Sequence, residues 1–192
     1  MAGLFTIAAA GAPQTAGRAP LPPDFFAAHA RQDMAAAILA LDRAGAACAA
    51  TKPQDDHCLD LFLAAANLSW RQSAIDRSER FARTAHEIAE RTLPATHKDR
   101  RVAHEYLIRA VIAGDKDAEA VTSLRAYLAL RGAADAPPDI ALARAHLQLG
   151  DSLHRLARHA ESEAVLRRAI TLFESLGDAG KLGHAQAVSD LA

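Results

Sequence analysis

Nine histidines are the residues of this 192-residue chain that most invite a chemical role, because imidazole serves both as metal ligand and as acid–base group. His86 and His104 are each followed by glutamate, which begins the His-Glu-x-x-His pattern of zinc proteases. Neither has a second histidine four residues later, so the zinc pattern fails. Asp151 and His154 place two further ligand types one helical turn apart, but only once. We therefore predict no metal site and no cofactor.

Phosphate binding and acyl transfer also lack their motifs. Gly177, Gly180 and Gly183 are spaced three apart, but no predicted strand precedes them and no Lys-Ser/Thr pair follows them. The sequence contains no Gly-x-Ser-x-Gly elbow, which presents the nucleophile of many hydrolases. We therefore expect a non-catalytic protein, without catalytic residues.

The two cysteines, Cys48 and Cys58, bracket a predicted turn between two helices. This placement is compatible with a disulfide, which requires Cα atoms within about 7 Å and an oxidising compartment. We expect buried free thiols instead, because unpaired cysteines pack as small hydrophobic residues.

The amino-acid composition indicates that helices form the framework of this protein and would position any functional site. Alanine occurs 48 times and leucine 23 times, whereas valine, isoleucine and threonine together occur 21 times. Alanine and leucine are strong helix formers and strands favour β-branched residues, so we predict an all-α fold. The formal net charge of -1 disfavours a nucleic-acid partner, which selects for basic surfaces. No apolar run reaches about 18 residues, so we expect no membrane insertion.

Residues 1–23 differ from the rest of the chain. They hold four prolines, three glycines and one charged residue, Arg18, without any helical or strand period. We interpret them as a flexible N-terminal segment and residues 24–192 as one helical domain. A secretory signal requires a lysine or arginine before its apolar stretch, but none precedes Leu4–Ala12. We therefore expect a cytoplasmic protein, with export as the alternative.

From Asp24 onward, apolar residues recur at helical spacing and polar turns separate the segments. The first helix is predicted to open at Asp24 and to continue to a polar break at 51–56. Later segments form helix pairs at about 57–94, 96–132 and 139–177, followed by a short terminal helix at 181–191. The first helices of successive pairs start near residues 59, 100 and 142, about 42 residues apart, which indicates an internal repeat.

The pair at 139–177 resembles the tetratricopeptide repeat (TPR), in a longer variant with a period of about 42 residues. That motif favours Leu-Gly within its first helix and two small residues, usually alanine, in its second. Leu149-Gly150 stands at the first place, and Ser162 and Ala169 stand at the others.

The two earlier pairs match the motif less closely. In the pair at 57–94, the corresponding places hold Ala65-Ala66, Ser78 and Ala85. In the pair at 96–132, Leu107 stands where a small residue belongs. The resemblance implies a short right-handed superhelix of stacked antiparallel helix hairpins, about three in number, with an N-terminal helix at one end. An irregular helical bundle is the alternative.

The resemblance also implies where a ligand would bind, because in TPR proteins the first helix of each pair lines a groove that holds a peptide. The carboxylate clamp of the family requires lysine where this chain has Leu63, so a chaperone C-terminal tail is not expected. Trp70 is equally compatible with a packing role. The residues placed on the groove by the motif are Asn67, Trp70, Arg71, His104, Arg144, Gln148, Asp151 and Arg155.

These observations predict a protein- or peptide-binding scaffold that acts as an adaptor, an assembly factor or a regulatory module. One alternative is a structural protein that self-associates into a homo-oligomer through an apolar helix face. A less favoured alternative is a helical metal-binding or enzymatic bundle whose site is assembled from distant helices.

Overall fold

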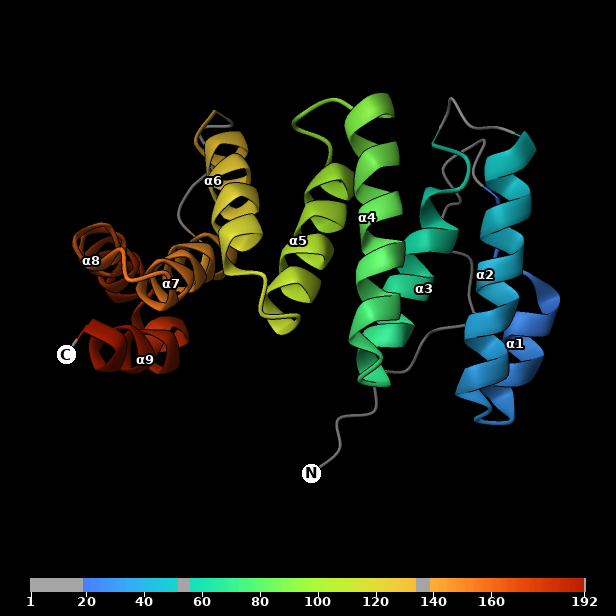
Figure 1. Ribbon diagram of the computed structural model, residues 1–192, viewed down its shortest axis with the longest axis horizontal. Coiled ribbons are helices and arrows are strands. Elements are labelled where there is room, and N and C mark those ends of the chain that lie inside the picture. The colour runs from blue at the N-terminus through green and yellow to red at the C-terminus, as the bar shows by residue number, and fades with distance from the viewer. Residues whose placement is uncertain (1–18, 52–55, 134–138, 192) are drawn as a thin grey trace.

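The computed structural model describes residues 19–51, 56–133 and 139–191, and every regular element within these ranges is a helix (Figure 1). The all-α fold predicted from composition is therefore confirmed. The elements are α1 (Pro23–Ala30), α2 (Met34–Thr51), α3 (Leu59–Arg71), α4 (Ile75–Thr92), α5 (Lys98–Ala113), α6 (Asp117–Ala133), α7 (Ile140–Arg155), α8 (His159–Ser175), a 3-10 turn, η1 (Gly177–Gly180), and α9 (Lys181–Leu191).

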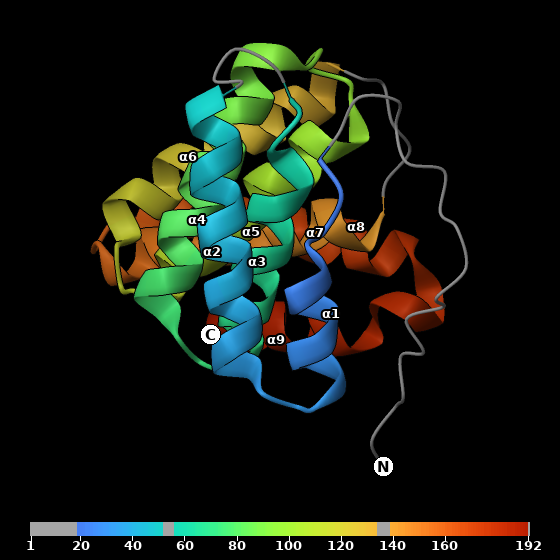
Figure 2. The same cartoon turned by 90° about the vertical axis from the view of Figure 1, so that its right-hand side faces the viewer.

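The helices are arranged as four hairpins that follow one another in chain order, with α9 at the C-terminal end (Figures 1 and 2). Each helix packs chiefly against its neighbours in sequence, and α3 also contacts α5. One core of buried apolar side chains extends from α1 to α7, and a smaller one joins α7, α8 and α9. Such nearest-neighbour packing is the architecture of a helical repeat protein.

The N-terminal hairpin differs from the single helix that the sequence predicted between Asp24 and the break at 51–56. That prediction is wrong, because the chain turns between α1 and α2, where Gln32 has a φ of 59°. The backbone N–H of Asp33 donates to the carbonyl of Ala28 at 3.0 Å and closes the end of α1. A left-handed residue at this place stops the helix even where the apolar spacing continues.

The flexible segment predicted for residues 1–23 lies mostly outside the described residues. Its described end is attached to the domain: the backbone N–H of Ala19 donates to the carbonyl of His57 at 2.7 Å, and Leu21 packs against the core. The helical domain therefore includes the residues just before α1.

Three later turns repeat one backbone conformation. Ser73, Asp115 and Ala157 have φ values of 56°, 55° and 57°, and successive members of this series stand 42 residues apart. At each turn the next residue donates its backbone N–H to the carbonyl five residues earlier, as in the Schellman motif that ends many helices. The turns therefore define a structural repeat of 42 residues.

This register corrects the sequence alignment of the middle pair. It sets Ile108, rather than Leu107, level with Ala66 in the preceding repeat and Gly150 in the following one. The sequence alignment is one residue out because Leu107 and Ile108 are adjacent, apolar and both buried. The hydrophobic pattern fits both registers, and only the backbone of the turn decides between them.

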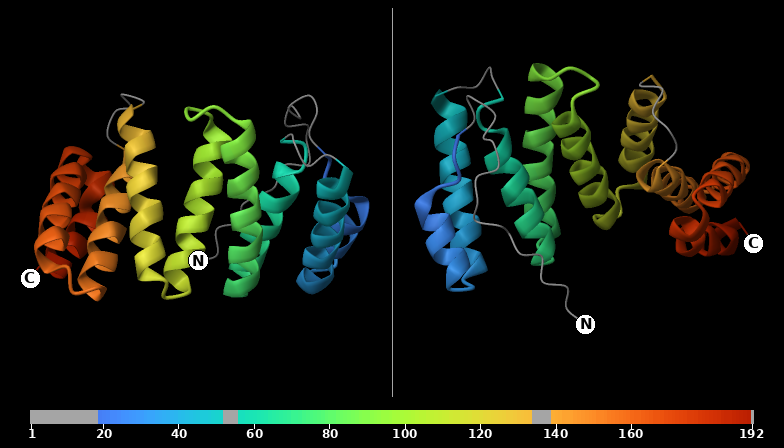
Figure 3. Two further views of the ribbon diagram at one scale, coloured as in Figure 1. Left: turned by 45° about the horizontal axis from the view of Figure 1, so that its top comes forward. Right: turned by 180° about the vertical axis from the view of Figure 1, so that it is seen from behind.

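Side-chain volumes at this place differ among the three hairpins. Gly150 on α7 contacts Leu166 on α8, and the equivalent residues of the first hairpin are Ala66 on α3 and Ala82 on α4. A Cβ atom placed on Gly150 would lie 2.5 Å from Cδ2 of Leu166, so α7 and α8 fit closely only because this residue has no side chain. The middle hairpin has the two large residues Ile108 and Leu124 here, and α5 and α6 diverge from their shared turn (Figure 3).

Buried serines join the helices of the first and third of these hairpins. Ser78 Oγ donates to the carbonyl of Ala66 at 3.0 Å, and Ser162 Oγ donates to the carbonyl of Gly150 at 2.8 Å. The equivalent residue of the middle hairpin is Ala120, which has no hydroxyl group. Serine therefore takes the place of the motif's small residue and adds a buried hydrogen bond there.

Helix α2 is long and apolar enough to span a membrane by length and composition, with a mean hydropathy of 1.3. The sequence prediction had expected no such segment. Core helices of water-soluble proteins pass the same test. Two ion pairs tie α2 into the stack, since Arg43 pairs with Asp24 of α1 at 3.1 Å and Asp42 pairs with Arg80 of α4 at 3.3 Å.

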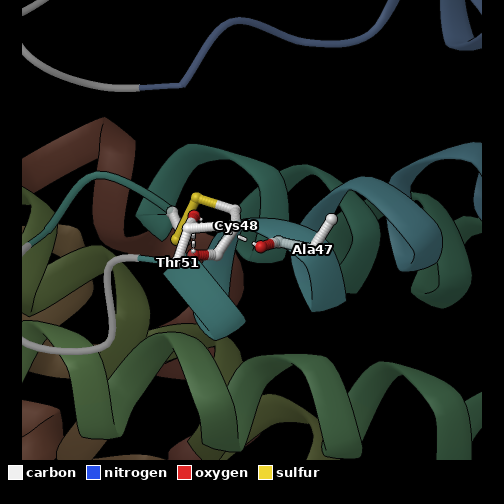
Figure 4. Close-up of a disulfide and its surroundings, with 4 residues drawn as sticks. Ala47, Cys48 and Thr51 are labelled. Atoms are coloured by element: carbon white, nitrogen blue, oxygen red, sulfur yellow. Dashed lines mark hydrogen bonds between the residues drawn. A yellow bond between two sulfur atoms is a disulfide. The ribbon is translucent and has the colours of Figure 1, made fainter.

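Cys48 and Cys58 form a disulfide, so the expectation of free thiols is wrong. The bond joins the last turn of α2 to the residue that precedes α3 (Figure 4). Close by, Thr51 Oγ1 donates to the carbonyl of Cys48 at 3.0 Å. Spacing in the sequence allowed this pairing, but only the fold brings the two Cα atoms to 5.7 Å.

Candidate functional site

The first helices of the three 42-residue repeats carry polar and aromatic side chains at equivalent places. Asn67 on α3, Arg109 on α5 and Asp151 on α7 share one place, and Tyr106 and Gln148 share another. We refer to these five residues, together with Trp70 on α3, as the first-helix face. All six are partly accessible to solvent.

The structure brings most of the sequence-predicted residues to this region. Asn67, Trp70, Gln148 and Asp151 belong to the first-helix face itself. Arg71, Arg144 and Arg155 are exposed on the same helices, α3 and α7. Arg155 already has a partner, since its Nε donates to Asp117 at 2.8 Å and ties α7 to α6.

His104 is the exception, because the structure places it in the core, with only 2% of its surface exposed. Its ring centroid lies 4.5 Å from that of His86 on α4 and 5.8 Å from that of Tyr127 on α6. In the 42-residue register His104 is equivalent to buried Phe62, and the place that the motif assigns to the groove is held by Glu105, which accepts a hydrogen bond from Tyr127 at 2.6 Å. The one-residue alignment error therefore assigned a packing residue to the groove.

Burial sets the charge state of this histidine cluster. Burial of the ring lowers the pKa of His104 to about 4, and it lowers the pKa of His86 as well. Both histidines are therefore neutral near pH 7, as their contact requires. Among the described residues, no group of three or more histidine, cysteine, aspartate or glutamate side chains could hold a metal ion.

Arg109 and Tyr106 are the residues that the sequence analysis missed. The guanidinium carbon of Arg109 lies 4.5 Å from the ring centroid of Trp70 and 4.7 Å from that of Tyr106. These are cation–π contacts, and the one with Trp70 joins α5 to α3. The signal for Arg109 was present in the sequence, because it follows Asn67 by 42 residues and precedes Asp151 by the same number.

Comparison with solved structures settles the fold. A protein from Podosopora anserina with nearly identical TPR-like repeats, named as a kinesin light chain, matches with a TM-score of 0.64 and 17% identity over 80% of this chain and 74% of that one. The apo form of RapI matches with a TM-score of 0.64 and 15% identity, over 87% of this chain and 58% of that one. This chain has a TPR-like fold. MamA shares the TPR-like fold more loosely, with a TM-score of 0.54 and 16% identity over 87% of this chain and 90% of that one.

No protein-family model and no curated protein matches the sequence. At identities of 15–17%, the structural matches establish the TPR-like fold and not a shared activity. The superhelix of stacked hairpins predicted from the sequence is thus confirmed.

The C-terminal helix reaches the TPR-like first-helix face through a pair of carboxyl groups. Asp151 on α7 is hydrogen-bonded to Asp190 on α9. Burial and the neighbouring Asp190 raise the pKa of Asp151 to about 7. A proton kept by Asp151 relieves the repulsion that two ionised carboxylates would have here. Asp151 is thus close to α9 and only partly available to a ligand.

Replacing Asp151 by asparagine is expected to remove a pH-dependent part of the stability. In the folded chain the Asp151 carboxyl keeps its proton up to a pKa of about 7, against 3.8 for the ordinary carboxyl. Its contribution to the free energy of unfolding is therefore largest at low pH and is lost as the pH rises through about 7.

Guanidinium midpoints at about pH 5 and about pH 8 would test this expectation. The unmodified chain should lose more stability across this range than Asp151→Asn does. Buried His104 has the opposite effect, because its lowered pKa stabilises the folded chain most above about pH 6.5. This effect is the same in both proteins, so it does not alter the comparison. Parallel pH profiles would contradict the assignment of this proton to Asp151.

Proposed function

We propose that this chain binds a protein or peptide partner on its first-helix face and catalyses no reaction. The first-helix face carries the proposal. Its six side chains are polar or aromatic and partly open to solvent, and all but Trp70 lie at repeat-equivalent places. On the same helices, the residues of the core are apolar and buried, for example Ala66 and Leu153. This pattern is expected of a binding surface that a repeat scaffold presents.

The TPR-like fold supports this proposal by analogy, since stacked helix pairs form extended surfaces on which many repeat proteins bind their partners. The role would be that of an adaptor, an assembly factor or a regulatory module. Side chains that combine an apolar body with a polar end, such as Trp70 and Tyr106, are enriched in protein interfaces.

Affinity capture from a lysate of the native host tests the proposal. The unmodified chain is compared with a double variant, Asn67→Ala/Arg144→Ala, and the captured proteins are identified by mass spectrometry. A matched control, Glu87→Ala/Arg168→Ala, changes two exposed residues of the second helices α4 and α8. We expect a partner that the first variant loses by about tenfold or more and the control retains. Equal capture by both variants would move the binding surface elsewhere.

Self-association is a second candidate function, which exposed apolar side chains at the two ends of the stack favour. Phe26 and Leu39 on the N-terminal hairpin are 55% and 53% exposed, and Leu182 on α9 is 83% exposed. Different surfaces at the two ends would give head-to-tail contacts. A molar mass that stays monomeric as the protein concentration rises would exclude this alternative.

The cytoplasmic location expected from the N-terminal segment stays a prediction. The disulfide between Cys48 and Cys58 supports the alternative, export, because reducing compartments keep most thiols free. The oxidation state of these two cysteines in the native host would distinguish the two locations.

A further inference from the structure

Arg109 is distinguished from the other partly buried arginines by having no carboxylate partner among the described residues. Arg83 donates to Glu119 at 2.7 Å, Arg131 donates to Asp139 at 2.6 Å, and Arg158 donates to Glu161 at 2.8 Å. No such bond reaches Arg109, whose Nε and one Nη are buried without any hydrogen-bond partner.

The electrostatic consequences of this difference are consistent with the geometry. Carboxylate partners raise the pKa of Arg131 and Arg155 above the ordinary value. Burial lowers the pKa of Arg109, because no anion offsets the loss of hydration. Arginine nevertheless stays protonated at neutral pH. The chain therefore holds an uncompensated positive charge on its first-helix face.

The surroundings of Arg109 fix the guanidinium without neutralising it. Trp70 comes from α3, in one repeat, and Tyr106 comes from α5, in the next, so the charge lies at the junction of two hairpins. Contact with two aromatic rings restricts the guanidinium plane and excludes water from it. A guanidinium held in this way has already lost much of the side-chain entropy that binding would otherwise cost.

The two repeat-equivalent residues do not supply the missing anion. Asn67 is neutral, and Asp151 is hydrogen-bonded to Asp190 at the C-terminal end of the stack. A guanidinium attracts a carboxylate and forms strong, charge-assisted hydrogen bonds with it. An acidic side chain of a bound peptide would provide the negative charge that Arg109 lacks.

We propose that Arg109, held by Trp70 and Tyr106, is the recognition site for an aspartate or glutamate side chain within an acidic peptide segment of the partner. The inference rests on the proposed function, because it names the ligand chemistry of the same face. The site differs from a clamp for a chain terminus, since the ligand group is an internal side chain and the receptor is a single arginine between two aromatic rings.

Trp70 makes the test direct, because it is the only tryptophan in the chain and it contacts Arg109. The probe is a hexaglutamate peptide, acetylated at its N-terminus and amidated at its C-terminus, and it is titrated against Trp70 fluorescence in the full chain. A hexaglutamine peptide with the same ends is the neutral control. A hexaglutamine peptide with a free C-terminal carboxylate distinguishes a chain terminus from an acidic side chain.

We expect saturable binding of hexaglutamate amide, weakened by salt, and no binding of either hexaglutamine peptide. Arg109→Gln should weaken binding by about tenfold or more, and Arg109→Lys should restore only part of it, because an ammonium group lacks the planar guanidinium that contacts both aromatic rings. Arg101→Gln, an exposed arginine of the same helix, is the charge-matched control and should bind as the unmodified chain does. Far-UV circular dichroism verifies that each variant is folded.

Three results would overturn the proposal: no binding of hexaglutamate, equal weakening by Arg101→Gln and Arg109→Gln, or tighter binding of the peptide with the free terminus. A failure of this inference is distinguishable from a failure of the proposed function. If a captured partner is lost by Asn67→Ala/Arg144→Ala but fully retained by Arg109→Gln, the face binds a protein and its ligand is not acidic.

Discussion

Replacing Gly150 by leucine is expected to lower the free energy of unfolding by about 3 kcal/mol. Even a single Cβ atom at this place would lie 2.5 Å from Cδ2 and 2.6 Å from Cγ of Leu166, well inside van der Waals contact. Leu166 is 1% exposed, so it has little space into which it could move. The added side chain must therefore push α7 and α8 apart. Chemical denaturation followed by circular dichroism measures the loss.

Two further variants make this prediction specific. Gly132→Leu introduces the same side chain at a glycine of α6 where a Cβ atom would meet nothing within 4 Å, and it should not lower stability, because leucine favours the helix over glycine by up to about 1 kcal/mol. Combining Gly150→Leu with Leu166→Ala should restore about 1 kcal/mol or more relative to the sum of the single changes. Strictly additive losses would show that Gly150 and Leu166 do not compete for the same space.

Replacing Phe173 by alanine is expected to cost about 3–5 kcal/mol, the range for removing a fully buried phenylalanine. Phe173 is 1% exposed and belongs to the smaller core that joins α7, α8 and α9. Its ring and its carbonyl group lie so close to Gly183 and Gly180 that neither glycine has room for a side chain. Loss of the ring would leave a cavity at the place where α9 docks.

The readout should show a local effect in addition to the global one. We expect α9 to become sensitive to limited proteolysis in Phe173→Ala before the remaining helices do, because this helix is held through the smaller core. Phe26→Ala removes the same ring from an exposed place on α1 and should change stability by less than about 0.5 kcal/mol. Equal losses in the two variants would contradict the docking role of Phe173.

The two predictions depend on features that differ in how far the sequence reveals them. Gly150 follows Leu149 within an apolar helical pattern, and this pair is enough to indicate close approach of a second helix. Gly180 and Gly183 gave no such signal. Both positions require glycine because Phe173 lies against them. Phe173 is close in sequence, but it contacts them only because η1 turns the chain back toward α8.

The candidate site was predicted in part for a similar reason. Asn67, Gln148 and Asp151 could be placed on the first-helix face from the motif alone, because the third repeat matches it closely and the first keeps the same register. In the middle repeat the motif is weak, so the sequence alignment was one residue out of register. It therefore assigned His104, a residue of the core, to the groove. Arg109 was missed by the same shift.

The sequence by itself determined that this chain is helical, that its helices form hairpins and that these recur every 42 residues. Those properties depend on helix propensity and on apolar spacing, which are local. Only the tertiary structure decided the turn at Gln32, the disulfide between Cys48 and Cys58, and the contact of Arg109 with Trp70. The physical reason is that each of these depends on a backbone dihedral or on the distance between residues of different helices. Neither quantity is fixed by the apolar pattern, because an adjacent pair such as Leu107 and Ile108 satisfies that pattern in two registers.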